Sequence, residues 1–182
     1  EGRRKQLGTW ARQCESTKRY RDLLVGLQQL PEFSISVDAF DRDPFLVNAR
    51  NCTLDLSSRR LESREHRADD FCFLQLGCDY DPHAVPVAFL AALNQSLPEP
   101  EIRHAFQVIM GQALIAKPIQ RLPFITGPGG QGKTTFAEAI AGVFGSYAKT
   151  IDAATLAESH RNGAAPSPDI ARLAGARLVM AN

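Results

Sequence analysis

One segment of the chain combines residue types and a spacing that are typical of phosphate binding. The pattern Gly-x-x-x-x-Gly-Lys-Ser/Thr is matched at every fixed position by the consecutive residues Gly127, Pro128, Gly129, Gly130, Gln131, Gly132, Lys133 and Thr134. Glycines let backbone N–H groups approach a ligand closely, and the start of a following helix favours negative charge. The segment therefore predicts a nucleotide site.

The side chains of this loop have separate expected roles. Lys133 carries a mobile positive charge that can reach the β- and γ-phosphates, so we assign the catalytic role to it. The hydroxyl of Thr134 is expected to ligate Mg²⁺, and Thr135 is expected to add to the nucleotide contacts. The alternative interpretation is a glycine-rich turn that happens to precede a lysine.

A phosphate loop needs a strand before it and a helix after it. The apolar run Leu122–Thr126 predicts a buried strand. After the loop, Phe136, Ile140 and Phe144 recur at helical spacing, and Gly145 is a natural end for that helix. Strand, loop and helix therefore follow one another in the required order.

Beyond this helix the sequence predicts a short strand over 149–152, an exposed loop over 159–168, a helix over 169–174 and a central strand over 176–182. Phosphate-loop enzymes place an acid at the end of a neighbouring strand. That acid is expected directly after Asn182, where the sequence stops, and neither Asp152 nor Asp169 is expected to end a buried strand. We therefore expect this piece to bind nucleotide phosphates at best, without the full catalytic set.

The sequence before the loop predicts an α+β region. A helical period runs through 3–29 and ends before Pro31. Strands are expected over 45–49, 53–56 and 71–76, with a hairpin turn at 57–60. Two helices are then expected, from Pro86 to Asn94 and from Glu101 to about Ala116. The predicted fold is an α+β amino-terminal region, with helices and a small antiparallel sheet, followed by a partial α/β P-loop NTPase domain of the AAA+ type.

Composition narrows the classes of protein to which the chain can belong. The hydrophobic fraction of 44% suits a globular core, no run is long enough to span a membrane, and the first residues have no apolar signal region behind them. The start lacks a methionine, so we expect an internal piece of a longer, cytoplasmic protein. The four cysteines form no C-x-x-C pair, which argues against a zinc site. Residues 1–30 carry seven Lys and Arg against three acids, which fits either contact with a nucleic-acid backbone by the basic residues 3–21 or a solvated helix face.

Longer patterns point to a family. The chain reads Asp41-x-Asp43-Pro44-Phe45-Leu46-x-Asn48-x-x-Asn51-x-Thr53-Leu54-Asp55-Leu56, then Asp79-Tyr80-Asp81-Pro82. This resembles the amino-terminal region of phage and plasmid primase-helicases, to which the poxvirus primase-helicase is similar. The phosphate loop, with Ser167-Pro168-Asp169-Ile170-Ala171-Arg172-Leu173-x-Gly175-x-Arg177-Leu178-Val179, resembles the superfamily 3 helicase domain that follows it.

The resemblance implies three segments: a helical linker over 1–40, a collar-like domain over 41–118 and a truncated helicase domain over 119–182. It also implies an ATP-driven DNA helicase that forms a homo-oligomeric ring on single-stranded DNA in phage or plasmid replication in a bacterial cell. The chain departs from the family at Cys52, where glycine is usual, and at Gln131 and Thr134, where many members have asparagine and serine. No primase catalytic acids are recognisable.

Two other functions stay open at this point. Residues 1–118 fit a non-catalytic module for ring assembly or DNA docking, and the loop alone also fits a small-molecule P-loop kinase. The resemblance upstream of the loop and over 167–179 argues against the kinase.

Overall fold

The computed structural model describes residues 2–117, 122–155 and 168–181. The chain forms two compact units, Glu1–Ala39 and Phe40–Asn182. The family-based boundary between 118 and 119 is a separate expectation and stays a prediction.

The first unit is built from two helices, α1 (Gly2–Cys14) and α2 (Thr17–Gln28), followed by the short turns η1 (Pro31–Phe33) and η2 (Val37–Ala39). The helical character expected over 3–29 is confirmed, but as two helices, because the helix is interrupted at Ser16. The backbone of Ser16 is extended and its hydroxyl accepts a hydrogen bond from the N–H of Arg19, as an N-cap does. None of the described residues of this unit is buried.

The second unit begins with a small antiparallel sheet of β1 (Leu46–Asn48), β2 (Thr53–Asp55) and β3 (Glu62–Arg64), in that order. Val47 lies opposite Leu54, and Leu54 opposite Ser63. The first two strands and the hairpin turn confirm the expectation from the sequence.

The third strand was expected at 71–76, and this was wrong. Phe71 ends the short turn η3 (Ala68–Asp70) in a left-handed conformation with φ 47°, which a strand does not allow. The N–H groups of Phe73 and Leu74 donate to the Asp41 carboxylate and that of Gln75 to the Ser146 hydroxyl, and of residues 73–76 only Leu76 donates to a strand, at the Asn48 carbonyl of β1. The third strand of the sheet is 62–64, which pairs with β2.

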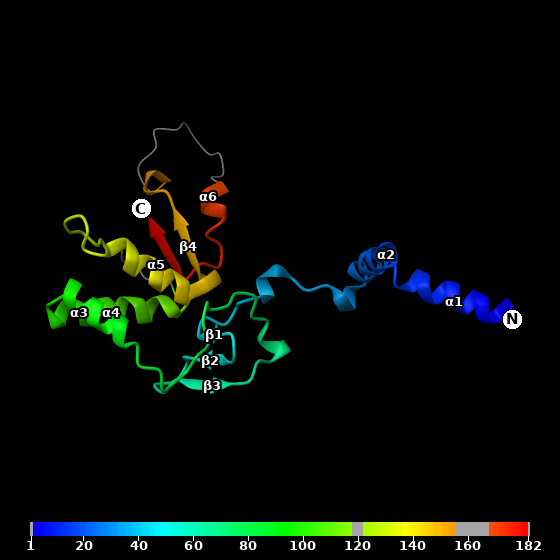
Figure 1. Ribbon diagram of the computed structural model, residues 1–182, viewed down its shortest axis with the longest axis horizontal. Helices are drawn as coiled ribbons and strands as arrows, with labels where there is room; N and C mark the ends of the chain where they lie inside the picture. The colour runs from blue at the N-terminus through cyan, green and yellow to red at the C-terminus, as the bar shows by residue number, and fades with distance from the viewer. Residues whose placement is uncertain (1, 118–121, 156–167, 182) are drawn as a thin grey trace. The chain divides into compact units, whose positions relative to one another are not determined.

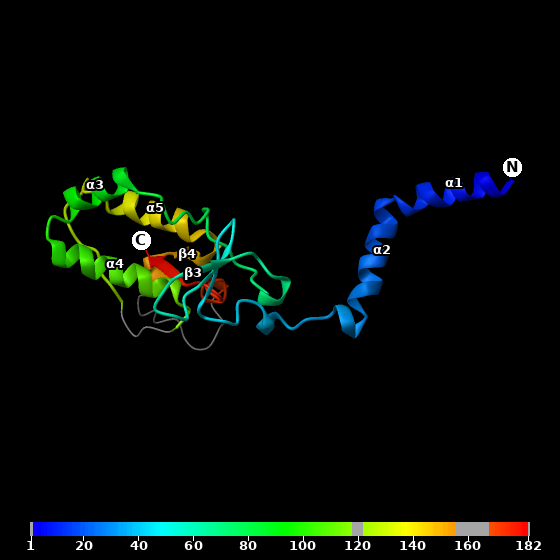
Figure 2. The ribbon, with the colours of Figure 1, turned by 90° about the horizontal axis from the view of Figure 1, so that it is seen from below.

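Three longer helices follow: α3 (Val87–Ser96), α4 (Pro100–Leu114) and α5 (Lys133–Phe144). In both ribbon views these helices lie close together (Figure 1, Figure 2). Their extents agree with the helical periods in the sequence to within a few residues. Pro86, expected in the first turn of α3, is instead the N-cap residue directly before the helix.

The carboxyl-terminal part adds a parallel pair of strands, β4 (Ala148–Ile151) and β5 (Leu178–Ala181), which lie beside α5 in Figure 1. The turns η4 (Gly145–Tyr147) and η5 (Ala153–Thr155) flank β4. The helix expected over 169–174 is shorter, α6 (Pro168–Ala171), and the exposed loop expected before it lies outside the described residues. Among the described residues β5 pairs with β4 alone, so it is not a central strand there.

The core of the second unit joins segments that lie far apart in the sequence. Its buried apolar residues are Val47, Ala49, Leu54, Leu76, Phe144 and Tyr147. They come from the antiparallel sheet, the extended segment after Phe71, the end of α5 and η4. The observed class is α+β, with helices and a small antiparallel sheet. In the described part of the chain no helix has both the length and the apolar character needed to cross a membrane.

Candidate phosphate-binding loop

The loop ends directly at the first residue of α5. Gly132 is the N-cap of this helix, with φ 76°, and Gly130 has φ 78°. Both values lie in the left-handed region that favours glycine. The Gly132 carbonyl accepts the N–H of Phe136 at 2.9 Å, so helical hydrogen bonding starts at once. The loop therefore faces the positive end of a 12-residue helix.

Lys133 folds back over the loop that precedes it. Its ammonium donates to the carbonyl oxygens of Gly127 and Pro128, at 2.8 and 2.6 Å. These two hydrogen bonds join Lys133, directly after the loop, to the first two loop residues. A phosphate arriving at the loop can take the place of these carbonyls as the partner of the ammonium, because charge-assisted contacts with an anion are the stronger ones.

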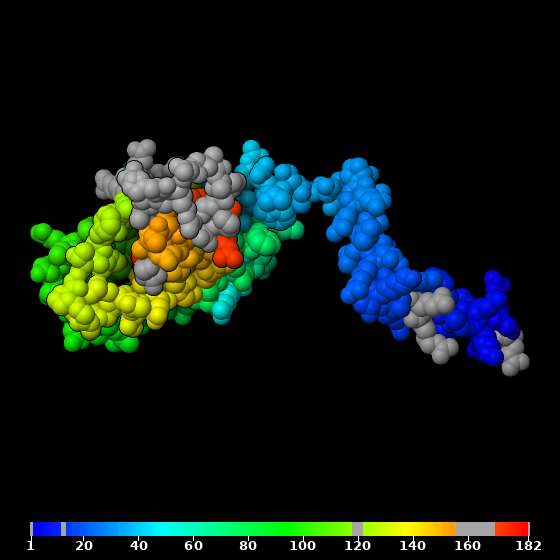
Figure 3. All heavy atoms as spheres, turned by 90° about the horizontal axis from the view of Figure 1, so that it is seen from above, coloured from blue at the N-terminus to red at the C-terminus, as the bar shows by residue number. Residues whose placement is uncertain are grey.

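The strand expected at 122–126 was wrong: the segment has no regular secondary structure and pairs with no strand among the described residues. Leu122, Phe124 and Ile125 are 65%, 80% and 58% exposed. The apolar pattern is present, but a strand also needs a neighbour for its backbone groups, and β4 and β5 pair only with each other in the described part. This segment and the loop, yellow-green to yellow in Figure 3, lie on the surface of the face shown there.

The groups at the loop fit a nucleotide with its metal ion. The hydroxyls of Thr134 and Thr135 are on exposed residues in the first turn of α5, next to the half-buried Lys133. Backbone N–H groups, one ammonium and hydroxyl oxygens form a donor set suited to phosphate oxygens and Mg²⁺. Thr134 is the residue that the motif assigns to the ion.

Two contacts from α3 reach this site, and sequence reasoning missed both. The Ser96 hydroxyl donates to the carbonyl of Gln131 at 3.3 Å. The ring of Phe89 meets that of Phe136 edge to face, with centroids 5.7 Å apart and planes at 80°. The local sequence does not indicate these contacts, since 35 positions separate Ser96 from Gln131.

The acid Asp152 directly follows β4, close to the strand expected over 149–152. Of the four residues of β4 only Ile151 is buried, which agrees with the expectation that Asp152 ends no buried strand. Its carboxylate already accepts the N–H of Ala154 at 2.8 Å and caps the turn η5. The side chain of Asp169 lies outside the described residues.

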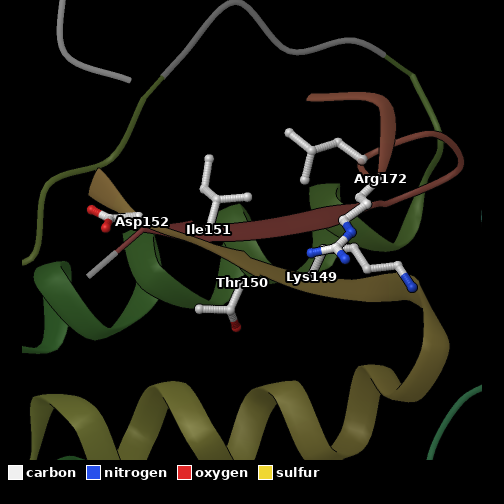
Figure 4. Close-up of a pocket in the computed structure, with 6 residues that line it drawn as sticks. Lys149, Thr150, Ile151, Asp152 and Arg172 are labelled. Carbon is white, nitrogen blue, oxygen red and sulfur yellow. The ribbon is translucent and has the colours of Figure 1, made fainter. Parts of the chain in front are cut away.

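A shallow cavity of about 410 Å³ lies along β4, away from the loop residues. Lys149 and Arg172 lie toward one end of it, and Asp152 lies at the other (Figure 4). No residue of 127–135 lines it, so it is not the nucleotide site.

Arg177 connects the strands to the helices in the same unit. Its guanidinium donates to the carbonyls of Leu114 and Leu46, at 2.6 and 2.7 Å, and lies over the Tyr147 ring, 4.5 Å from its centroid. Burial lowers the pKa of Arg177 and raises that of the Tyr147 phenol. The Tyr147 hydroxyl accepts the N–H of Asn48 at 3.1 Å.

Comparison with known proteins identifies the first part of the chain. A family model described as D5 N terminal like matches residues 1–110. The match covers the first unit, the antiparallel sheet and α3, and ends within α4; the phosphate loop lies outside it. No curated protein matches the chain.

Proposed function

The chain belongs to the D5 N-terminal-like family, and from this premise we propose that it is part of an ATP-dependent DNA helicase in a primase-helicase type of replication protein. Residues 127–135 form its nucleotide site. In this proposal residues 119–182 belong to a superfamily 3 motor, attached to the family's amino-terminal region.

One observation supports the proposal most directly. The Lys133 ammonium is held by the first loop carbonyls, at the start of a helix whose cap residue is a left-handed glycine. Such a lysine is positioned to exchange carbonyl partners for the β- and γ-phosphates of ATP. The Thr134 hydroxyl would hold Mg²⁺, which when bound neutralises charge that develops on the phosphates.

The proposed partners are single-stranded DNA and further copies of the chain, arranged as a ring. The proposed setting is the cytoplasm of a bacterial cell, within phage or plasmid replication. These follow from the family and from the patterns at 41–56 and 167–179.

A second candidate function is a non-catalytic module for assembly or docking, and the first unit favours it. Its two helices leave Trp10, Leu23 and Leu24 more than half exposed, beside basic residues. Contiguous patches of exposed apolar side chains are typical of surfaces that meet a partner, and the two helices of this unit expose several large apolar side chains.

ATP hydrolysis by the intact protein tests the proposal. With single-stranded DNA present we expect stimulated turnover, and Lys133→Ala should abolish it because the phosphates lose their cation. Lys117→Ala is the matched control and should leave turnover unchanged. Lys117 is exposed, lies just after α4 in the chain and contacts the Phe45 ring. Turnover that survives Lys133→Ala sinks the assignment of this lysine. Absence of DNA stimulation in the wild type favours the docking module.

A further inference from the structure

We propose that helix α3 holds the phosphate loop in its binding shape and that Ser96 is the positioning residue. The inference rests on the proposed nucleotide site. It concerns a residue inside the family-matched region, outside the motif itself.

The hydrogen bond from Ser96 fixes one peptide plane of the loop. In a trans peptide the C=O and the following N–H point in opposite directions. Because the Gln131 carbonyl is turned toward Ser96, the N–H of Gly132 faces away from α3. This N–H is one of the loop donors available to phosphate, so Ser96 sets the direction in which it points.

The neighbouring contacts confine Gly132 between two side chains. A Cβ built on Gly132 would lie 3.7 Å from the Phe136 ring and 3.9 Å from the Ser96 hydroxyl oxygen. Phe136 is itself held against Phe89 of α3. Gly132 of the loop and Phe136 in the first turn of α5 therefore both lie against residues of α3.

Pre-positioned donors bind more tightly than donors that must be ordered by the ligand. Without the Ser96 hydroxyl the peptide after Gln131 can rotate, and nucleotide binding must fix it. The expected consequence is weaker binding of the phosphates, with the catalytic groups themselves unchanged.

The test is nucleotide affinity in the intact protein, measured with an N-methylanthraniloyl-labelled ATP and Mg²⁺. Ser96→Ala should weaken binding about three- to tenfold, as loss of one hydrogen bond implies. Ser96→Thr keeps the hydroxyl and should bind within about twofold of the wild type. Gln95→Ala, next to it on an exposed position of α3, is the control and should change nothing.

Two further readouts separate positioning from a general structural role. Competition by inorganic pyrophosphate should weaken as much as ATP binding does, because the lost contact orients a phosphate donor. In steady-state hydrolysis KM should rise while kcat stays close to that of the wild type. A merely structural role would lower kcat and the melting temperature together.

The outcomes distinguish this inference from the proposed function. If Lys133→Ala abolishes labelled-ATP binding and Ser96→Ala leaves it unchanged, the role of Ser96 is wrong and the nucleotide site stands. The role is equally overturned if Ser96→Thr binds as weakly as Ser96→Ala. If the wild type does not bind the labelled ATP, both proposals fail.

Discussion

Arg177 shows how one side chain can hold three segments of this molecule together. It donates one hydrogen bond to the carbonyl of Leu114, the last residue of α4, and one to the carbonyl of Leu46, the first residue of β1. Its guanidinium also covers the ring of the buried Tyr147. Planar guanidinium groups suit such combined stacking and two-point bonding, which a lysine cannot reproduce. Burial lowers the pKa of this arginine, and the nearby Asp41 and Asp43 act in the opposite direction.

Replacing Arg177 is therefore expected to cost stability. Arg177→Ala leaves the carbonyls of Leu46 and Leu114 without their donor and should lower the free energy of unfolding by about 2–4 kcal/mol. Arg177→Lys should fall between this variant and the wild type. Urea denaturation measures the effect, with Arg42→Ala, at an exposed position, expected to stay within about 0.5 kcal/mol of the wild type. Equal stability of Arg177→Ala and Arg42→Ala would show that the two carbonyls find other partners.

At this scale the sequence is informative only where the chemistry is local. Gly132 and Lys133 could be predicted because the phosphate-loop motif is contiguous, and their local geometry fits it. Ser96 and Arg177 could not, since their partners lie 35 and 131 positions away. Nothing in the composition of either neighbourhood encodes such a contact.

Helices were predictable as elements because their periods are long, whereas short strands were predictable only in part. The failures at 71–76 and 122–126 share a physical cause: an apolar run forms a strand only when a neighbouring backbone takes its hydrogen bonds. At the first segment Asp41 and Ser146 accept the N–H groups of 73–75, and only that of Leu76 donates to a strand, at the Asn48 carbonyl. At the second no described strand is adjacent. The break at Ser16 has a different origin, because a serine hydroxyl competes for helix N–H groups.

The junction between α5 and η4 gives a sharp prediction about one element end. Gly145 has φ 55° and ψ −125°, and a Cβ there would lie 2.5 Å from the Gly77 nitrogen and 2.6 Å from the Gln75 carbonyl oxygen. Both obstacles are backbone atoms, so no side chain can move aside. Gly145→Ala should therefore lower the free energy of unfolding by about 2–5 kcal/mol.

Gly142 is the matched control for this substitution and lies three residues earlier, inside α5. A Cβ on Gly142 meets nothing within 4 Å, so Gly142→Ala should raise stability by about 0.5–1 kcal/mol through helix propensity. The melting temperature of Gly145→Ala should fall below that of the wild type, and that of Gly142→Ala should rise above it. A neutral Gly145→Ala would mean that the segment 75–77 does not approach the end of α5 this closely.

On the scale of the whole molecule, the sheet of the family-matched region and the helix of the phosphate loop share one core. Val47 and Leu54 of the sheet pack with Phe144 and Tyr147, which follow the loop. The Gly77 N–H also donates to the Val143 carbonyl at 2.9 Å. The loop is thus attached, through a rigid helix, to the sheet at 46–64, although the family match ends before the loop begins.

This sharing predicts that damage at the end of α5 spreads to the antiparallel sheet. Phe144 is 4% exposed, and Phe144→Ala should lower the free energy of unfolding by about 3–5 kcal/mol. Val143→Ala alters a side chain that is 49% exposed and should cost much less. Amide hydrogen exchange then locates the effect: with Phe144→Ala, the protected N–H groups of β1 and β2 should exchange faster, together with those of α5. Loss of protection confined to α5 would show that the sheet folds without the phosphate-loop helix, and would separate the two parts that the core now joins.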